Sequence, residues 1–303
     1  MTQTLIILSM EKQLTRSQKS TTWRGIYLSR ANARVLLLIL MLLATLPMLY
    51  AWLPLGDDWP TFFRPATLML LRGQSPYSVG IGFYNPPWAL LPLVPMALLP
   101  FQWGRLVLFF VSLAAFAYGA RKLTSQPISI LLFMTSTPVV FCLNGGNIDW
   151  LLMLAFVTPA PFALMLAAIK PQIGIGIAFY WLIESWRLGG IRLMIKNFTP
   201  VGLLLIASFL LYGFYPLSFG QLNHVIWNAS PFPYLIPLGV FFLVSVLRSQ
   251  EDNPLMAAGL FFSPYFSIHS LFTFLVPLLE RPKVLFVAWT LLWIAVMAKA
   301  VIR

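Results

Sequence analysis

Charged side chains are scarce in this 303-residue chain. Only 9% of its residues are Asp, Glu, Lys or Arg, whereas 59% are hydrophobic. A soluble domain carries about a quarter charged residues, so the composition excludes an ordinary soluble protein. Several apolar runs approach or exceed the ~20 residues that a helix needs to cross a bilayer. The sequence therefore predicts an all-α polytopic membrane protein.

Metal ligands and disulfide partners are also scarce. Cys142 is the one cysteine, which excludes an internal disulfide and a thiolate metal cluster. The two histidines, His224 and His269, are too few for a His-rich metal site. Hard divalent cations prefer carboxylates, but the adjacent Asp57 and Asp58 do not by themselves define a metal site. We therefore predict neither a metal nor a cofactor.

Acidic residues are outnumbered, and the net charge is +12. Six of the 20 Lys and Arg residues precede the first apolar run, and others lie between later runs, at 187–196, 248 and 281–283. Short cytoplasmic loops of membrane proteins carry this excess, so the charge does not indicate a nucleic-acid partner. Residues 1–34 are too long and too polar for a cleaved signal peptide. We expect 1–34 to be a basic cytoplasmic segment and 35–303 to form a single multi-pass domain in the cell membrane.

The first apolar run, 34–54, leads outward under this topology, so the stretch after it forms the first outer loop. Within that loop "TFFRPATLMLLRG" is too short to span, and its apolar spacing suits a helix lying along the interface. Later runs bring the expected number of spans to between eight and ten. Two passes between 85 and 120 would put Arg121 and Lys122 outside. Either one of the two runs is re-entrant or the charge bias is locally broken.

Several polar residues fall at the outer face in this topology. Asp57 and Asp58 follow the first span, and the cations Arg64, Arg72 and Lys170 break the charge bias. Alone, Lys170 could be a snorkelling interfacial lysine and the aspartates could cap a helix. Together the outer-face candidates for catalysis or substrate binding are Asp57, Asp58, Arg64, Arg72, Asn147, Lys170, His224 and His269, with Asp149 of "NGGNID" beside them.

This combination suits a reaction that removes a proton and expels a phosphate. A general base requires a carboxylate held near an acceptor hydroxyl. A departing phosphate requires fixed positive charge, which is worth most in a site of low dielectric constant.

Residues 57–100 carry the strongest resemblance to a known family. An acidic residue is followed by "LLRG", "SPY" and then "FYNPPWALLPLVPMALLP", and further along come "NGGNID", "AAIKPQ" and "SPYFSIHS". The order resembles that of the polyprenyl-phosphate-mannose-dependent α-1,2-mannosyltransferase-like family of the GT-C glycosyltransferase superfamily. The resemblance implies a GT-C-like helical bundle and a catalytic base at Asp58 or Asp57. It also implies that Lys170 and His269 bind or orient the lipid phosphate.

The expected activity is an inverting hexosyl transfer at the extracytoplasmic face. The partners are a polyprenyl-phosphate-linked sugar, mannose-like in the family, a glycan or glycolipid acceptor, and the surrounding membrane lipids. A transporter or flippase for a lipid-linked anion is the alternative, which the proline-rich, broken spans favour and the absence of an inverted repeat disfavours. A non-catalytic scaffold would leave Lys170 and the aspartate pair unexplained.

Overall fold

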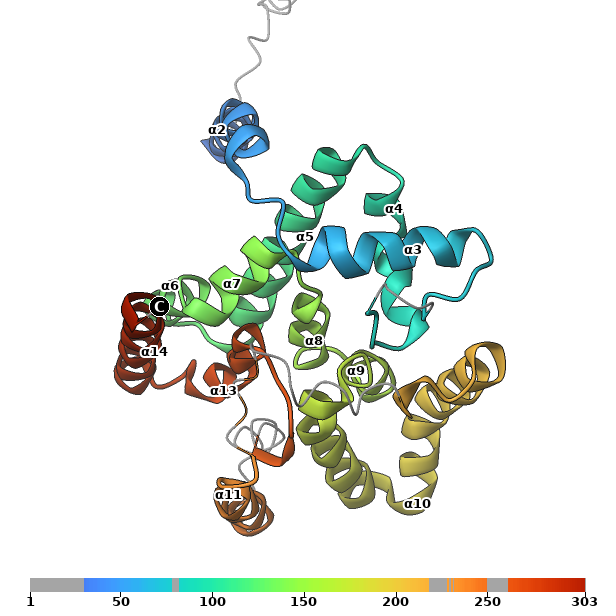
Figure 1. Ribbon diagram of the computed structural model, residues 1–303. Helices are drawn as coiled ribbons and strands as arrows, with labels where there is room; N and C mark the ends of the chain where they lie inside the picture. The colour runs from blue at the N-terminus through green and yellow to red at the C-terminus, as the bar shows by residue number, and fades with distance from the viewer. Residues whose placement is uncertain are drawn as a thin grey trace, which may run out of the picture. The chain divides into compact units, whose positions relative to one another are not determined.

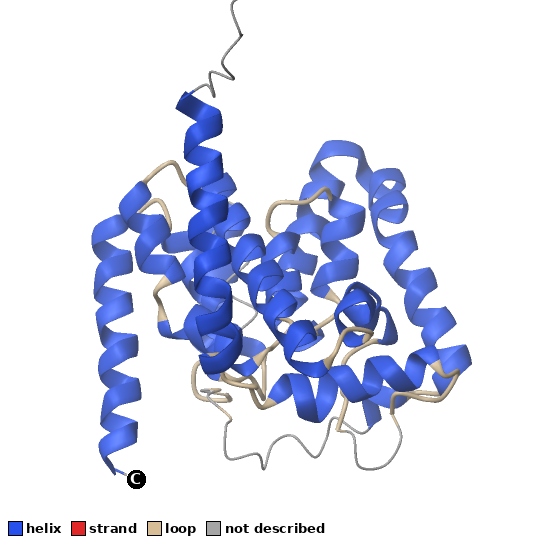
Figure 2. Ribbon diagram, turned by 90° about the horizontal axis from the view of Figure 1, so that it is seen from above, coloured by secondary structure: helices blue, strands red, loops and turns tan. Residues whose placement is uncertain are grey.

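The computed structural model describes residues 30–77, 82–217, 228, 230, 232–249 and 261–302. Over these residues the chain is helical and contains no strand (Figures 1 and 2). The chain divides into two units, Met1–Ala51 and Trp52–Arg303, and each is described by itself. Helix α2 (Arg30–Trp52), whose last residue belongs to the second unit, covers the first predicted span.

The second unit contains many helices, several of them short. In chain order they are η2 (Trp59–Phe63), α3 (Arg64–Leu71), η3 (Pro87–Leu93), α4 (Val94–Ala97), α5 (Phe101–Leu123), α6 (Pro127–Met134), α7 (Thr137–Gly145), α8 (Asp149–Ala155), α9 (Ala160–Ala167), α10 (Pro171–Tyr212), α11 (Ile236–Ser249), η5 (Ile268–Leu271), α13 (Phe272–Leu275), η6 (Val276–Leu278) and α14 (Pro282–Ile302).

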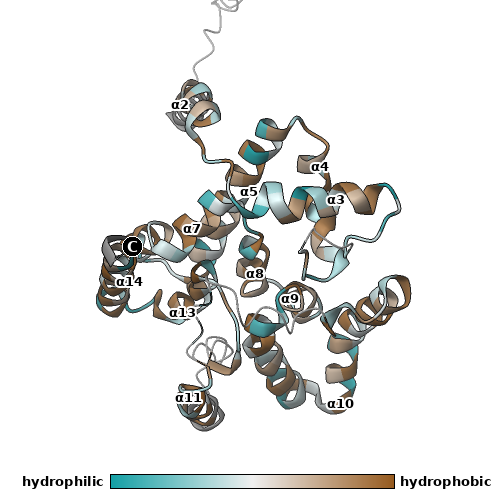
Figure 3. Cartoon of the chain, viewed as in Figure 1, coloured by the Kyte–Doolittle hydropathy of each residue, from teal (hydrophilic) through white to brown (hydrophobic). Residues whose placement is uncertain are grey.

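Three described helices are long and apolar enough to cross a membrane: α5, α10 and residues Pro282–Lys299 of α14. The pair α6 and α7, bent by 49° at the break between them, would make a fourth. Figure 3 shows hydrophobic residues along much of α10 and α14. The prediction of an all-helical fold is thus confirmed over the described residues, and these three helices are compatible with a membrane protein. The eight to ten spans and the GT-C-like bundle stay predictions.

Proline explains why one predicted span is short. The run 85–101 forms only the seven-residue η3 and the four-residue α4. Proline lacks the N–H donor that a continuing helix requires, and Pro86, Pro87, Pro92 and Pro95 all fall within this run. The chain then turns so sharply that a Cβ on Gly104 of α5 would lie 2.2 Å from the carbonyl oxygen of Met96. A helix of this length, packed back on α5, favours the re-entrant alternative for this run.

Helix α10 is a hairpin of two arms rather than one 42-residue rod. Gly189 and Gly190 have non-helical backbone angles, with φ of +59° at Gly190. Asn197 Nδ2 donates a 2.9 Å hydrogen bond to Ser185 Oγ. Those residues would be about 18 Å apart along a straight helix, so the second arm folds back beside the first, as the bend in Figure 1 shows. The turn carries part of the basic cluster 187–196 that the sequence places in the cytoplasm.

The first predicted outer loop contains the expected short helix. The five-residue η2 and the eight-residue α3 follow each other directly and are together too short to span a bilayer. Trp59, Phe63, Ala66 and Thr67 are buried, and this spacing places them on one helical face. That face anchors the segment immediately after Asp58 to the protein core.

The core lies where short helices pack against α5. Helix α8 contacts α5 on one side and α9 on the other, and α9 packs along α10. Phe116 of α5 meets Phe133 of α6 and Phe272 of α13 edge to face, with ring centroids 6.2 and 5.3 Å apart. This packing fixes the ends of α7, α8, α9 and η5 near one another.

Candidate functional site

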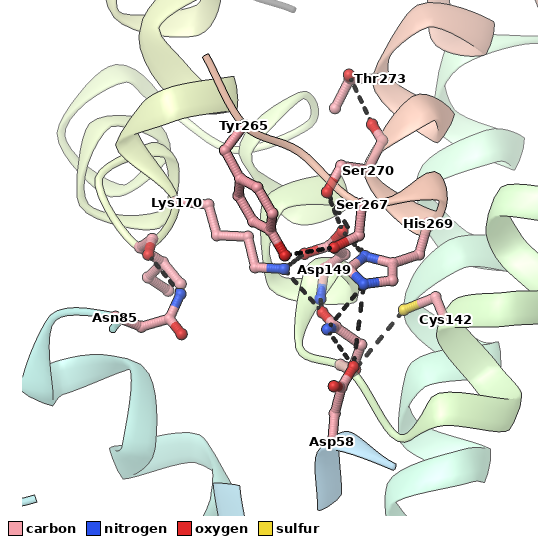
Figure 4. A network of polar contacts seen from close by, with 12 residues as sticks. Asp58, Asn85, Cys142, Asp149, Lys170, Tyr265, Ser267, His269, Ser270 and Thr273 are labelled. Carbon is pink, nitrogen blue, oxygen red and sulfur yellow. Dashed lines mark hydrogen bonds and ion pairs between the residues drawn. The ribbon is translucent and has the colours of Figure 1, made fainter. Parts of the chain in front are cut away.

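Six polar side chains from four separate segments meet at the ends of these helices, and Figure 4 labels all of them except Asn147. We call this group the polar cluster: Asp58, Asn147, Asp149, Lys170, His269 and Ser270. Asp58 directly precedes η2, Asn147 follows α7, Asp149 begins α8, Lys170 directly precedes α10, and the last two lie in η5. Four of the motifs noted in the sequence therefore converge on one site.

Local sequence explains how Lys170 reaches this site. It precedes Pro171, and the residue before a proline is kept out of the α region by steric contact. Lys170 accordingly has φ −129° and ψ 78°, which separates α9 from α10. Its Nζ forms an ion pair with Asp149 Oδ1 and donates to Asn147 Oδ1 at 3.0 Å. The lysine is thus a buried, paired cation rather than a snorkelling one.

Asp149 is the inner anchor of the cluster. Besides the ion pair, its Oδ2 lies 2.7 Å from His269 Nδ1 and accepts a hydrogen bond from Ser270 Oγ at 2.9 Å. Burial alone would raise the pKa of the Asp149 carboxyl, but the Lys170 charge and the contacts from His269 and Lys170 hold that pKa below its usual range. Asp149 is therefore an ionised carboxylate whose two oxygens are both occupied by the protein.

Asn147 connects Lys170 and Asp149, on one side of the cluster, to Asp58 and His269 on the other. Its Oδ1 accepts from Lys170 Nζ and from the backbone N–H of Asp149 at 3.1 Å. Neither donor can accept a hydrogen bond, so the orientation of the amide is determined. Its Nδ2 then lies 2.6 Å from Asp58 Oδ2 and 3.2 Å from His269 Nε2.

Exposure increases from one end of the cluster to the other. The exposed side-chain fractions are 0% for Asp149, 10% for Lys170, 13% for His269 and 23% for Asp58. Within the described residues, only one oxygen of Asp58 has a protein partner, Asn147 Nδ2. Asp58 is therefore the carboxylate of the cluster that a substrate can reach.

Two close contacts hold the Asp58 loop against the Asn147 loop. Gly56 has φ +77°, and a Cβ there would lie 2.4 Å from the carbonyl oxygen of Gly145. Arg105, which is 1% exposed, donates from Nε to the carbonyl of Leu55 at 3.1 Å. Its Nη2 donates to the carbonyls of Leu143 and Asn144 at 2.6 and 2.8 Å.

Arg105 thereby sets the separation of the two loops. A cation at the carboxyl end of a helix also interacts favourably with the helix dipole, and the carbonyls of Leu143 and Asn144 are at that end of α7. The sequence gives no sign of this role, because Arg105 reads as an ordinary charge at the edge of a span.

The other predicted site residues do not join the cluster. Asp57 is exposed. Arg64 lies over the Phe101 ring, 5.5 Å from its centroid, with Nη2 3.4 Å from the Leu99 carbonyl oxygen. Arg72 is exposed at the end of α3. Their predicted roles in catalysis or anion binding gain no support from this geometry, and His224 lies outside the described residues.

Two supporting residues were missed in the sequence. Ser270 adjoins His269 in "SIHS" and could have been found as a second hydrogen-bonding residue there. Asn85 donates from Nδ2 to the Ile169 carbonyl at 2.9 Å, and its own carbonyl accepts from Tyr77 Oη at 2.8 Å. Asn85 thus ties the proline-rich segment to the residue before Lys170.

Among the described residues, no group of three or more His, Cys, Asp or Glu side chains could hold a metal ion. Comparisons with protein-family models, with curated proteins and with solved structures gave no match. The family resemblance seen in the sequence therefore stays a prediction, and the polar cluster is the structural feature from which a function can be inferred.

Proposed function

We propose that this protein is an inverting membrane glycosyltransferase that moves a mannose-like sugar from a polyprenyl-phosphate donor to a glycan or glycolipid acceptor. The observation that carries the proposal is the position of Asp58. It is the most exposed carboxylate of a cluster in which Asn147, Asp149, Lys170 and Ser270 are buried and the His269 side chain is only 13% exposed. A base must be accessible and held in place, and Asp58 is both.

In the proposed reaction the acceptor hydroxyl donates its proton to the free oxygen of Asp58. The hydroxyl oxygen attacks the anomeric carbon, a new glycosidic C–O bond forms, and the bond from that carbon to the phosphate oxygen breaks with its electron pair. The lipid phosphate departs as the leaving group. Asn147 keeps Asp58 oriented by its hydrogen bond to Oδ2 throughout.

Leaving-group stabilisation is the more demanding part of the proposal. Asp149 already balances the charge of Lys170. Lys170 therefore offers a lipid phosphate a directed N–H donor rather than an uncompensated cation, because an ammonium has three donors and the contacts named above use two of them. Arg64 and Arg72 would supply charge only if the donor lipid extends along α3.

Product formation tests the proposal. Membranes containing the protein are incubated with a radiolabelled polyprenyl-phosphate mannose and a glycolipid acceptor, and the labelled lipids are separated. We expect a new labelled glycolipid that membranes without the protein do not form. Release or movement of intact donor without such a product would instead favour the transporter, for which the bent α6–α7 pair is the supporting observation.

A further inference from the structure

The hydrogen bonds around His269 determine which of its ring nitrogens carries the proton. Lys170 and the Asp149 N–H fix the Asn147 amide, so Asn147 Nδ2 is the donor that faces His269 Nε2. Nε2 must then accept, and Nδ1 carries the hydrogen that is donated to Asp149 Oδ2 at 2.7 Å. In this arrangement His269 is neutral, with a lone pair on Nε2.

That lone pair lies beside the proposed base. His269 Nε2 is 3.9 Å from Asp58 Oδ2, and both atoms receive a hydrogen of the same Asn147 amide group. Among the described residues, the other titratable side chains that are ion-paired or hydrogen-bonded to this site are Lys170, Asp149 and Cys142, whose Sγ lies 3.6 Å from the Asn147 carbonyl oxygen. None of these three groups combines an available acceptor atom with proximity to Asp58, whereas His269 does.

We propose that His269 takes from Asp58 the proton that Asp58 removes from the acceptor, with Asp149 stabilising the resulting imidazolium. The O–H bond of protonated Asp58 breaks, an Nε2–H bond forms, and Asp58 is again a carboxylate. Asn147 gives up its hydrogen bond to Nε2 and keeps the one to Asp58. Imidazole is a stronger base than a carboxylate, and a buried aspartate on Nδ1 is the arrangement that stabilises an imidazolium.

The proton transfer to His269 makes the charge of the cluster less negative at the point where the phosphate departs. Asp58, Asp149, Lys170 and neutral His269 together carry one excess negative charge, which repels a phosphate. Once the acceptor proton is on His269, the cluster is neutral and has a new cation, so the departing phosphate is repelled less. The inference rests on the proposed function for its substrate, but the protonation behaviour of His269 can be measured without any substrate.

The test is nitrogen NMR of the full chain labelled with ¹⁵N-histidine in detergent micelles. The His269→Gln variant identifies the signals of His269, since His224 is the only other histidine. We expect the parent to show the neutral tautomer with hydrogen on Nδ1 at high pH. In Asp58→Asn the loss of the neighbouring negative charge should make His269 titrate at a lower pH than in the parent, whereas the matched Asp57→Asn change should leave the titration unaltered.

A neutral His269 with its hydrogen on Nε2, or a titration that is the same in Asp58→Asn as in the parent, would overturn the inference even if sugar transfer is observed. Failure of the parent to form product would overturn the proposed function and leave the NMR result standing. His269→Gln keeps a hydrogen-bonding side chain but accepts no proton, so we expect its turnover to fall about 10²-fold or more. That loss should shrink at high pH, where solvent takes the proton from Asp58 more readily. A loss of the same size at every pH would show that His269 acts only as a support.

Discussion

Asp149 and Asp58 are both aspartates, and they lie at opposite ends of one hydrogen-bonded cluster. Asp149 is fully buried and gives both oxygens to Lys170, His269 and Ser270. Asp58 is 23% exposed, and among the described residues its one hydrogen bond is the one that it accepts from Asn147. The first carboxylate has no oxygen left for a substrate, and the second does. By its burial and bonding, Asp149 holds the cluster together, whereas Asp58 has the exposure that the proposed chemistry requires.

The largest predicted effect is a loss of stability on breaking the buried ion pair between Lys170 and Asp149. Asp149→Asn leaves the Lys170 ammonium buried without its counter-ion, and Lys170→Met leaves the carboxylate without its cation. Removing one partner of a buried ion pair costs about 3–5 kcal/mol, so each variant should have a markedly lower free energy of unfolding in detergent. The double variant should lose clearly less than the two single losses together. Single variants as stable as the parent would show that the pair does not hold the site.

A second prediction concerns the contact that positions the outer end. Gly56 has a positive φ, and in Gly56→Ala the added Cβ would lie 2.4 Å from the Gly145 carbonyl oxygen. Because that distance is too short, the Asp58 loop must move away from Asn147. Gly73→Ala is the matched control, because Gly73 has φ +71° and nothing within 4 Å of an added Cβ. The shared backbone strain costs about 1–3 kcal/mol. We expect Gly56→Ala to lower thermal stability more than Gly73→Ala and also to reduce turnover. Equal behaviour of the two variants would contradict the proposed loop contact.

The sequence predicted most members of the polar cluster, and it missed features that depend on how distant segments pack against one another. Asp58, Asn147, Lys170 and His269 were expected at one membrane face, and Asp149 was a candidate beside them; the structure brings all five together. The sequence could not separate Asp57 from Asp58, because the direction of a side chain before η2 depends on how Trp59 is buried. It also could not predict the contacts of Arg64 and Arg105, because each of these cations has a backbone carbonyl from a distant segment as a partner.

Helix positions were likewise more predictable than the number of spans. The first apolar run, 34–54, located α2 to within a few residues. The number of spans depends on whether proline-broken pieces such as η3 and α4 cross or re-enter, and composition alone does not decide this.

The smallest predicted effect is a difference in thiol labelling with little change in stability. It tests on which side of the membrane the Asp58 end of the polar cluster lies. In a Cys142→Ala background, a cysteine at Ser75, which is exposed in the first loop, should react with a membrane-impermeant thiol reagent in intact cells. A cysteine at Ser249, at the end of α11, should react only after the cells are opened, and stability should change little. Labelling of Ser249 but not of Ser75 in intact cells would place Asp58 at the cytoplasmic face.

The role of Asp58 as the base is tested by the initial rate of labelled glycolipid formation in Asp58→Asn and in Asp57→Asn, compared at equal amounts of inserted protein. Asparagine keeps the shape and hydrogen-bonding capacity of aspartate but is not a base, and loss of a general base costs about 10²–10⁴-fold in rate. We expect a loss of that size in Asp58→Asn, a much smaller loss in Asp57→Asn, and unfolding temperatures near that of the parent in both. Rapid product formation by a well-folded Asp58→Asn protein would show that Asp58 is not the base.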